Sequence, residues 1–568
     1  MTSGQQGNGL RRVMNRLDLT MAGLGAIIGS GWLFGAMVAS SMAGPASIFG
    51  WLIGGIAVLL IGLVYAELAG MLPEAGGIAR YPHFTHGSLT GWMMGWGAFL
   101  SYSSVPAIEA EAVTQYASHY LPALAPKGHA LVSPAGMALN IVLVVVFFGI
   151  NSLGVKVFAK TNTTVTLIKA IMPTATVIVL LFAAHNWGNI TSHATGGFAP
   201  FGVAGVLKAV GLSGIVFSFL GFRQAVDLAG EAKNPQRDVP KAIIGAVGFA
   251  IVLYALLELV FVAALPHSDL ANGWAKLSLS APFAQLASAL SLGWLAILLY
   301  ADAVISPAGT GNGYTASSAR VLYALGNNRY LPKVFTSTNS ANGAPLVSLA
   351  FGALFSILYL LPFPSWATLV GVISASTVFT YIIGPISAGV LRRTHPNAKR
   401  PFRLGGMEII GPAAFMIGSL IIYWTGWKTD WKLVVAILGG TIVWAIANAG
   451  AKAGTIHKID AASIASSAWL FGYLIFMLAA TYFGSARFGS PYNHSKGLIH
   501  YPFDLIAVAL ISLAFYYWGV ASGRATPETE AALQEALSLE ATAPSFSPAH
   551  SLASDKSAGT EGLGTAGA

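Results

Sequence analysis

The chain has 568 residues, of which 55% are hydrophobic and only 9% are charged, with a formal net charge of +9 and no cysteine. A soluble domain carries about 25% charged residues, so this composition indicates an integral membrane protein with many spans. The lack of cysteine excludes disulfides, thiolate metal sites and thiol catalysis. The positive charge does not indicate nucleic-acid binding, because the basic residues lie in loops between apolar segments.

A polar N-terminal segment, residues 1–16, has no cleavable signal pattern. It precedes about fourteen apolar segments, each with the roughly 20 residues that a bilayer span requires. These segments are residues 19–42, 45–70, 91–118, 134–152, 161–184, 207–230, 241–265, 284–307, 345–362, 366–391, 408–427, 432–449, 464–484 and 502–522. The eighth is expected to continue as a helix to about Tyr323. The composition of residues 524–568 predicts a disordered tail, apart from a short helix at 527–541.

Lys and Arg residues concentrate in alternate loops between the apolar segments. Cytoplasmic loops of membrane proteins carry an excess of these two residue types. The pattern therefore predicts an even number of spans in the cell (inner) membrane, with the N-terminus and the C-terminus both in the cytoplasm.

Glycines interrupt two of the segments: Gly29 and Gly31 flank Ser30 in the first, and Gly221 holds the corresponding place in the sixth. Glycine favours the opening of a helix, and opened backbone inside a membrane is tolerated only where it lines a cavity or is buried in protein. Free N–H groups suit an anion and free C=O groups suit a cation. The pattern predicts a transporter with a carboxylate site at two helix breaks. The alternative is that these glycines are packing contacts between helices.

Four further groups of residues form motifs: Gly25–Gly31, Tyr65–Leu68 with Pro73–Gly77, Phe217–Phe222 with Glu231–Ile243, and Ser317–Leu325. Together they resemble the motifs of the amino acid–polyamine–organocation (APC) superfamily over roughly residues 15–450. Residues 76–82, 107–112 and 221–227 are most similar to its bacterial aspartate:proton symporter branch.

The resemblance implies an all-α membrane protein with the LeuT-type fold, in which spans 1–5 and 6–10 form two inverted repeats. Spans 1 and 6 would be broken, and about four further helices would be peripheral. The implied organisation is a cytoplasmic segment at 1–16, a transport core at 17–400, peripheral spans at 401–523 and a cytoplasmic tail at 524–568.

The resemblance also implies where an α-amino acid binds. The substrate carboxylate would meet amides around Ser30 and Gly31, and the ammonium would meet carbonyls of Ile27, Phe217, Ser218 and Leu220, with Trp32, Phe219 and Phe222 as aromatic lids. An open N–H group attracts the anion and an open carbonyl attracts the cation.

Charged residues within spans are costly and are candidates for function. Lys169 lies about 15 Å from the cytoplasmic end of span 5 at 1.5 Å per residue, too deep for its side chain to reach the interface. It resembles the lysine that replaces a sodium ion in proton-coupled members, where it would bind span 1 carbonyls near Gly23 or Ala26. Burial favours loss of its proton, which would couple transport to protons. The alternative is a structural lysine paired with a carboxylate.

Arg223 stands where many relatives carry an acidic residue. Its guanidinium stays protonated and could bind the side-chain carboxylate of aspartate or glutamate. The alternative is an internal ion pair with Asp227, one helical turn further on, or with Asp302 of span 8.

Five acidic residues complete the set of candidates. Glu109 and Glu111 lie two residues apart in span 3 and must point to different faces. Glu109 is the preferred proton site or Arg223 partner, Asp302 is a further proton-coupling candidate, and Glu258 of span 7 is similar. Glu67, near a span end, is expected to brace a loop through Arg80 or backbone amides.

These observations predict a proton-coupled symporter of amino acids, with aspartate and glutamate favoured. Its expected partners are the amino acid, protons and the lipid bilayer. The alternatives are an exchanger, a polyamine importer or a neutral amino acid permease of the same fold. No catalytic constellation, P-loop or metal-ligand spacing occurs in the sequence, so neither an enzyme nor a cofactor or metal is expected.

Overall fold

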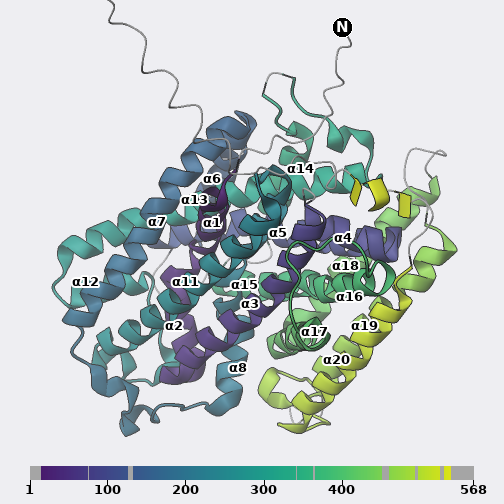
Figure 1. Cartoon of the computed structure of the whole chain (residues 1–568). Helices are drawn as coiled ribbons and strands as arrows, with labels where there is room; N and C mark the ends of the chain where they lie inside the picture. Colours follow the sequence, from purple (N-terminus) through teal and green to yellow (C-terminus); the bar gives the residue numbers. More distant parts are fainter. Residues whose placement is uncertain are drawn as a thin grey trace, which may run out of the picture.

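Helices make up the regular structure of the residues that the computed structural model describes (Figure 1). These residues are 14–73, 76–125, 132–340, 342–361, 365–450, 459–492, 497–524 and 530–538 without 532 and 536. Within these ranges the only strand-like pairing is an isolated bridge between Met14 and Ala232. The prediction of an all-α protein is therefore confirmed.

In the described part of the predicted transport core there are sixteen α-helices. They are α1 (Arg16–Ile27), α2 (Gly31–Ala43), α3 (Ser47–Met71), α4 (Gly77–His86), α5 (Ser88–Ala117), α6 (Pro134–Ser152), α7 (Val155–Ala183), α8 (Gly202–Leu212), α9 (Ile215–Phe219), α10 (Phe222–Asp227), α11 (Pro235–Ala264), α12 (Pro282–Ala289), α13 (Gly293–Asn327), α14 (Leu346–Leu360), α15 (Trp366–Tyr381) and α16 (Ile383–Thr394). Four more follow: α17 (Met407–Thr425), α18 (Trp427–Gly450), α19 (Ala461–Phe483) and α20 (Phe503–Ser522).

Helix starts follow local capping chemistry. Asn15 and Asp18 form a capping box that satisfies free amides at the start of α1. Proline occupies the first turn of α6 and of α11, where its missing N–H group costs nothing. Mostly apolar residues follow these starts. They form helices because inside a bilayer the backbone N–H and C=O groups must bond to each other.

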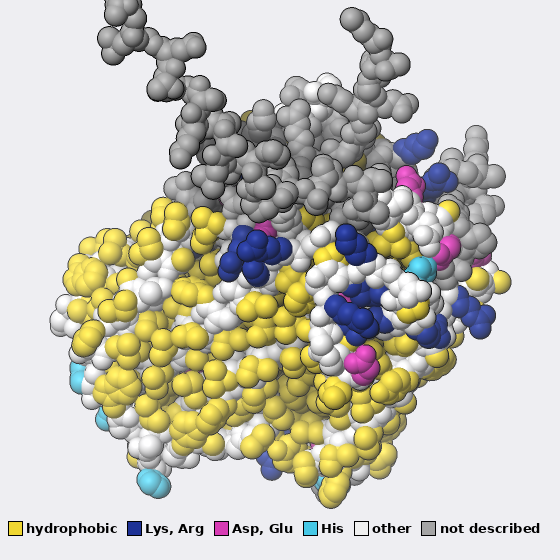
Figure 2. Space-filling model, in the orientation of Figure 1, with side chains coloured by type: hydrophobic (Ala, Val, Ile, Leu, Met, Phe, Trp, Pro, Cys, Tyr) yellow, Lys and Arg dark blue, Asp and Glu magenta, His cyan; other side chains and the backbone are white. Residues whose placement is uncertain are grey.

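Among the described residues, ten helices or helix pairs are long and apolar enough to cross a membrane, or eleven if the bent pair α8 and α9–α10 counts as one span. The chain is therefore a multi-pass membrane protein. Hydrophobic side chains cover most of the face drawn in Figure 2, and its Lys and Arg side chains gather mainly in the upper part. Each predicted segment overlaps a helix or a broken helix, but the count of fourteen spans stays a prediction.

Two of the predicted segments are broken. In the first, Ile28 has an extended backbone (φ −86°, ψ 90°) between the end of α1 and the start of α2. In the sixth, a 52° bend separates α8 from α9–α10. The bend lies at Gly214, which has φ +94°. The helix is interrupted a second time at Leu220–Gly221, between α9 and α10, at the place where the sequence predicted a break.

The eighth predicted segment needs a correction at its start. Residues 284–307 are not one helix, because α12 ends at Ala289 and α13 begins at Gly293, with Ser291 in the left-handed region (φ 61°). The far end of α13 extends to Asn327, which confirms the predicted continuation to about Tyr323.

The broken helices occupy the middle of the helix bundle. α1 contacts α7, α10, α11 and α13, while α5 packs along α13 and α15. At one edge of the molecule, α19 and α20 lie side by side (Figure 1). The central position of the breaks places their backbone groups among buried side chains of the surrounding helices.

The described part of the tail packs against the end of α16. Residues 530–538, without 532 and 536, are helical. Leu533 is buried, and Glu530 accepts a hydrogen bond from Gln534 and pairs with His395 at 3.0 Å. These bonds lower the pKa of Glu530. This segment is thus ordered, within the short helix predicted at 527–541.

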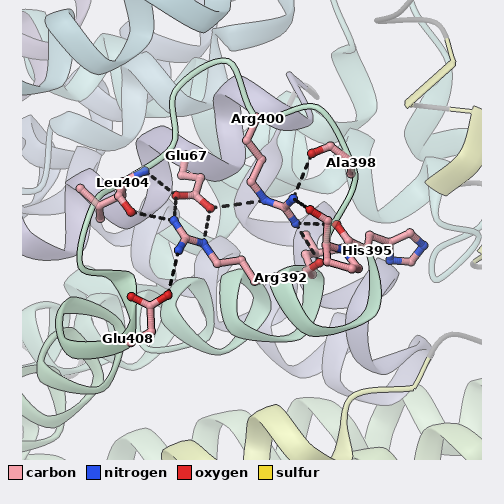
Figure 3. Close-up of polar contacts among 9 residues, drawn as sticks. Glu67, Arg392, His395, Ala398, Arg400, Leu404 and Glu408 are labelled. Carbon is pink, nitrogen blue, oxygen red and sulfur yellow. Dashed lines mark hydrogen bonds and ion pairs between the residues drawn. The ribbon is translucent and has the colours of Figure 1, made fainter.

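A buried carboxylate connects the end of α3 to the α16–α17 connection (Figure 3). Glu67 accepts two hydrogen bonds from Arg392, at 2.8 and 2.6 Å, and a third from the amide of Leu404 at 2.7 Å. Arg400 lies 3.5 Å from the same carboxylate. The expected backbone amide is present, but the basic partners are Arg392 and Arg400. Arg80 instead donates to Asn328.

Replacing Glu67 by alanine should lower the free energy of unfolding by about 3 kcal/mol, because Arg392 loses its counter-charge in a largely buried place. Thermal unfolding of the purified protein in detergent measures this effect. The control is Glu408→Ala: Glu408 is 79% exposed and lies 3.5 Å from Arg392, so its loss should cost less than about 1 kcal/mol. Equal destabilisation by the two changes would contradict the role given to Glu67.

Candidate functional site

The backbone around the first break is bonded to side chains from three other helices. The amide of Ser30 donates to Oε2 of Glu109 at 2.8 Å. The Ser30 hydroxyl accepts from the indole of Trp366 at 2.8 Å, and the Ile27 carbonyl accepts from the hydroxyl of Tyr254 at 2.9 Å. Protein side chains thus occupy the Ser30 amide and the Ile27 carbonyl, two of the groups that the sequence predicts to bind substrate.

The second break approaches the first through small residues. A methyl group placed on Gly31 would lie 3.1 Å from the Cβ of Ser218, so the two segments touch. Ser218 is bonded within its own turn, with its amide and its hydroxyl both donating to the Gly214 carbonyl. The Leu220 carbonyl accepts from the hydroxyl of Tyr381 at 3.2 Å, and the Phe217 carbonyl accepts from the Leu220 amide at 3.2 Å. These carbonyls are likewise engaged within the protein.

Lys169 reaches the same broken segment from α7. Its side chain is 1% exposed, and its ammonium donates to the Gly25 carbonyl and, at 2.6 Å, to the hydroxyl of Thr310. Thr310 also donates to the carbonyls of Gly25 and Ile28, both at 3.1 Å. The lysine thus ties α7 and α13 to the last turn of α1 at the Gly25 carbonyl, which lies near Gly23 and Ala26 as predicted.

Glu109 and the Lys169–Thr310 pair meet at Gly29. A methyl group on Gly29 would lie 2.6 Å from Oε1 of Glu109 and 2.9 Å from the Thr310 hydroxyl. A carboxylate and an ammonium therefore bracket the opened backbone within a few ångströms. Asp302 is further off: it precedes Thr310 by eight residues on α13, about 12 Å along the helix axis, and its Oδ2 accepts from Ser306 at 2.8 Å.

Arg223 belongs to a different cluster. Its Nε donates to the hydroxyl of Tyr102 at 2.8 Å, and the guanidinium lies 3.8 Å from the centre of the Tyr102 ring. The Tyr102 hydroxyl in turn donates to Asp227. Of the two alternative partners, Asp227 is connected to Arg223 through Tyr102, whereas Asp302 bonds within α13.

The remaining span acids differ in their surroundings. Glu258 accepts three hydrogen bonds, from Ser40 at 2.6 Å, Ser47 at 2.5 Å and the indole of Trp51 at 2.7 Å, and so links α11 to α2 and α3. Glu111 is buried, and neither of its carboxyl oxygens has a hydrogen-bond partner among the described residues. The two acids of span 3 do face different surroundings, as their spacing predicts.

Trp366 is an aromatic residue at the first break that the sequence analysis does not single out. It binds Ser30 and packs 5.0 Å from the ring of Phe34 and 6.3 Å from that of Phe217. Among the predicted lids, Trp32 lies against Phe283, Phe219 against Trp51 and Tyr254, and Phe222 against Tyr65 and Tyr381, and their role as lids stays a prediction. Trp366, Tyr254 and Thr310 carry no signal in the sequence, since single polar-tipped residues recur throughout its apolar segments.

Comparison with known proteins gives consistent matches. Residues 14–443 match the family model described as "Amino acid permease". The chain is 40% identical over 524 residues to the glutamate/serine transporter AimA of Bacillus subtilis, which covers 91% of this chain and 95% of that protein. It is 40% identical over 523 residues to the aspartate-proton symporter of the same organism, and the match covers 91% of this chain and 98% of that protein. The branched-chain amino acid permease BcaP is 25% identical over 455 residues.

Proposed function

Because this chain belongs to the amino acid permease family, we propose that it is a symporter that imports amino acids together with protons, with aspartate and glutamate as favoured substrates. Both relatives at 40% identity have an acidic amino acid in their names. The chain is a transporter of this family and not an enzyme.

The single observation that carries the proton coupling is the bond between the Ser30 amide and Glu109. In the proposed site the substrate carboxylate takes the amides around Ser30 and Gly31. Two carboxylates cannot share one N–H donor without strong repulsion, so Glu109 must release Ser30 before the substrate binds. A proton on Glu109 neutralises it and makes this release favourable. Binding of a proton and of an amino acid are then linked.

Lys169 supplies the second proposed coupling group. While charged, it holds α1 to α7 and α13 through Gly25 and Thr310. Loss of its proton removes the charge that strengthens these bonds and frees α1 to move. Asp302 lies about 12 Å from Thr310 along the axis of α13. We propose it as a proton acceptor on the path to Lys169, since its Oδ1 has no hydrogen-bond partner among the described residues.

For the amino acid itself, we assign the ammonium to the carbonyls of Ile27, Phe217, Ser218 and Leu220. Tyr254 and Tyr381 now donate to two of these carbonyls, so both hydroxyls must turn away when the substrate arrives. Phe219 contributes its backbone and packing, since its ring faces Trp51 and Tyr254.

The architecture proposed for this function is the LeuT-type inverted repeat, with fourteen spans, a core at 17–400 and peripheral helices at 401–523. It is supported by two central breaks, one between α1 and α2 and one at α8–α10, that touch at Gly31 and Ser218. We place the protein in the cell membrane with both termini in the cytoplasm, in accord with the distribution of Lys and Arg among the loops.

The test is uptake into proteoliposomes with an imposed pH gradient, with and without sodium, using aspartate, glutamate, serine, leucine and putrescine. We expect acid outside to drive concentrative uptake of aspartate and glutamate without sodium. The name of the glutamate/serine transporter makes serine the informative neutral substrate. Uptake that requires sodium, or that occurs only against a preloaded amino acid, would contradict the proposal and favour a sodium symporter or an exchanger.

A further inference from the structure

The Arg223 cluster has polar atoms that the protein leaves unmatched. Arg223 is 1% exposed and Asp227 is 3% exposed. Nη1 and Nη2 of Arg223 and Oδ1 of Asp227 have no hydrogen-bond partner among the described residues. A buried guanidinium or carboxylate without partners is costly, so such atoms indicate a ligand.

The unmatched atoms have complementary chemistry. The two terminal nitrogens of a guanidinium form a planar fork that fits a carboxylate. One helical turn further along α10, the unpartnered oxygen of Asp227 is an acceptor that suits an ammonium group. The Tyr102 hydroxyl fixes both side chains, by accepting from Nε of Arg223 and donating to Asp227. Together they offer both poles that a free amino acid requires.

Neighbouring side chains hold the guanidinium in one orientation. It lies between the ring of Tyr102, at 3.8 Å, and that of Tyr381, at 5.0 Å, and such cation–π contacts favour a fixed planar group. The next residue, Gln224, is bonded to Ser317 of α13. The fork is therefore preorganised, which reduces the cost of ordering it when a ligand binds.

The cluster is separate from the site at Ser30. Tyr102 belongs to the Arg223 cluster, and Glu109 belongs to the site at Ser30. Both lie on α5, seven residues or about 10 Å apart along its axis. One small amino acid does not span both. The cluster lies toward the end of α3, because Tyr65 contacts the rings of Phe222 and Tyr381 and is two residues from Glu67.

We propose that Arg223 and Asp227 form a second binding site for the transported amino acid, on the release path between the Ser30 site and the end of α3 that carries Glu67. The carboxylate of the amino acid binds the guanidinium fork, and its ammonium binds Asp227. Arg223 thus acts on the substrate after it leaves Ser30, and not at the same time. This inference rests on the proposed transport function.

The experiment measures equilibrium binding of radiolabelled L-aspartate to the purified full-length protein in detergent. We expect two molecules per chain for the unmodified protein and one for Arg223→Gln. Gly31→Val, whose side chain would overlap Ser218 and separate the two breaks, should also leave one, and the double variant none. Arg223→Lys keeps the charge without the fork and should weaken the second site about tenfold or more. One molecule per chain in the unmodified protein would overturn the proposal, as would two in Arg223→Gln.

Folding is checked by thermal unfolding of every variant. Asp227→Asn should lose the second site. The control Asp430→Asn alters a buried acid of α18 that accepts a hydrogen bond from Thr481 of α19, and it should keep both sites. If Arg223 were only a brace, variants that stay folded would bind two molecules. Proton-driven uptake by the unmodified protein is measured in parallel: its absence contradicts the proposed function, while uptake with a single binding site contradicts only this inference.

Discussion

Replacing Lys169 by alanine should reduce proton-driven amino acid uptake at least tenfold. The change removes the charged donor from the Gly25 carbonyl and from the Thr310 hydroxyl, which keep the bond between them. A hydrogen bond to a charged group contributes about 1.5–3 kcal/mol. The change also removes the only group among the described residues that ties α7 to this turn of α1 by a charge. Uptake into proteoliposomes at several external pH values measures the effect, with the exposed Lys276→Ala as control.

Lys169→Arg separates a coupling role from a structural one. An arginine keeps the positive charge and the donors, but it does not lose its proton in a protein. If Lys169 releases a proton during transport, the arginine variant should fold, show normal thermal unfolding and still fail to accumulate substrate. Full pH-dependent uptake in either the alanine or the arginine variant would show that Lys169 does not couple transport to protons.

Replacing Gly221 by alanine should abolish transport and destabilise the protein. An added methyl group would lie 2.6 Å from the carbonyl carbon of Ala26 and 2.6 Å from the carbonyl oxygen of Gly23. These atoms belong to the backbone of α1 and cannot turn aside as a side chain could. Overpacking of a well-packed interior costs about 1–3 kcal/mol or more, and here it also pushes α10 away from α1.

The matched control for this change is Gly248→Ala in α11. A methyl group there meets no atom within 4 Å, and alanine in a helix interior is favoured over glycine by up to about 1 kcal/mol. Thermal unfolding in detergent and uptake should therefore fall for Gly221→Ala and stay level or rise for Gly248→Ala. Normal uptake by Gly221→Ala would mean that α1 and α10 need not approach so closely.

The helical fold and the first break were predictable because hydropathy and glycine leave local signals. Long apolar segments require helices in a bilayer, and Gly29 and Gly31 mark the place where one of them opens. The sixth segment is interrupted twice, at Gly214 and at Gly221, and the prediction named only the second of these places. Both Gly214 and Gly221 are visible in the sequence, but only the structure separates their tasks: Gly214 adopts a positive φ, and Gly221 allows two backbones to touch.

The bonding of the site was not predictable from the sequence. Tyr254 and Trp366 are separated by hundreds of residues from the groups they bind, Ile27 and Ser30, and no spacing rule joins such pairs. Lys169 could be singled out because a charge in a span is rare. Its partner Thr310 could not, because threonine is ordinary in membrane helices and its role depends on packing between α1, α7 and α13.

The three hydrogen bonds to Glu258 have a mechanical consequence. The buried Glu258 of α11 accepts hydrogen bonds from Ser40 of α2 and from Ser47 and Trp51 of α3, so one carboxylate joins three helices. The half of the first broken helix beyond Ser30 therefore moves only together with two long neighbours. On the proposed function, access to Ser30 from that side then requires a shift of α15, which breaks the indole bond from Trp366 to Ser30. We expect the lifetime of this bond to set how often the proposed site opens.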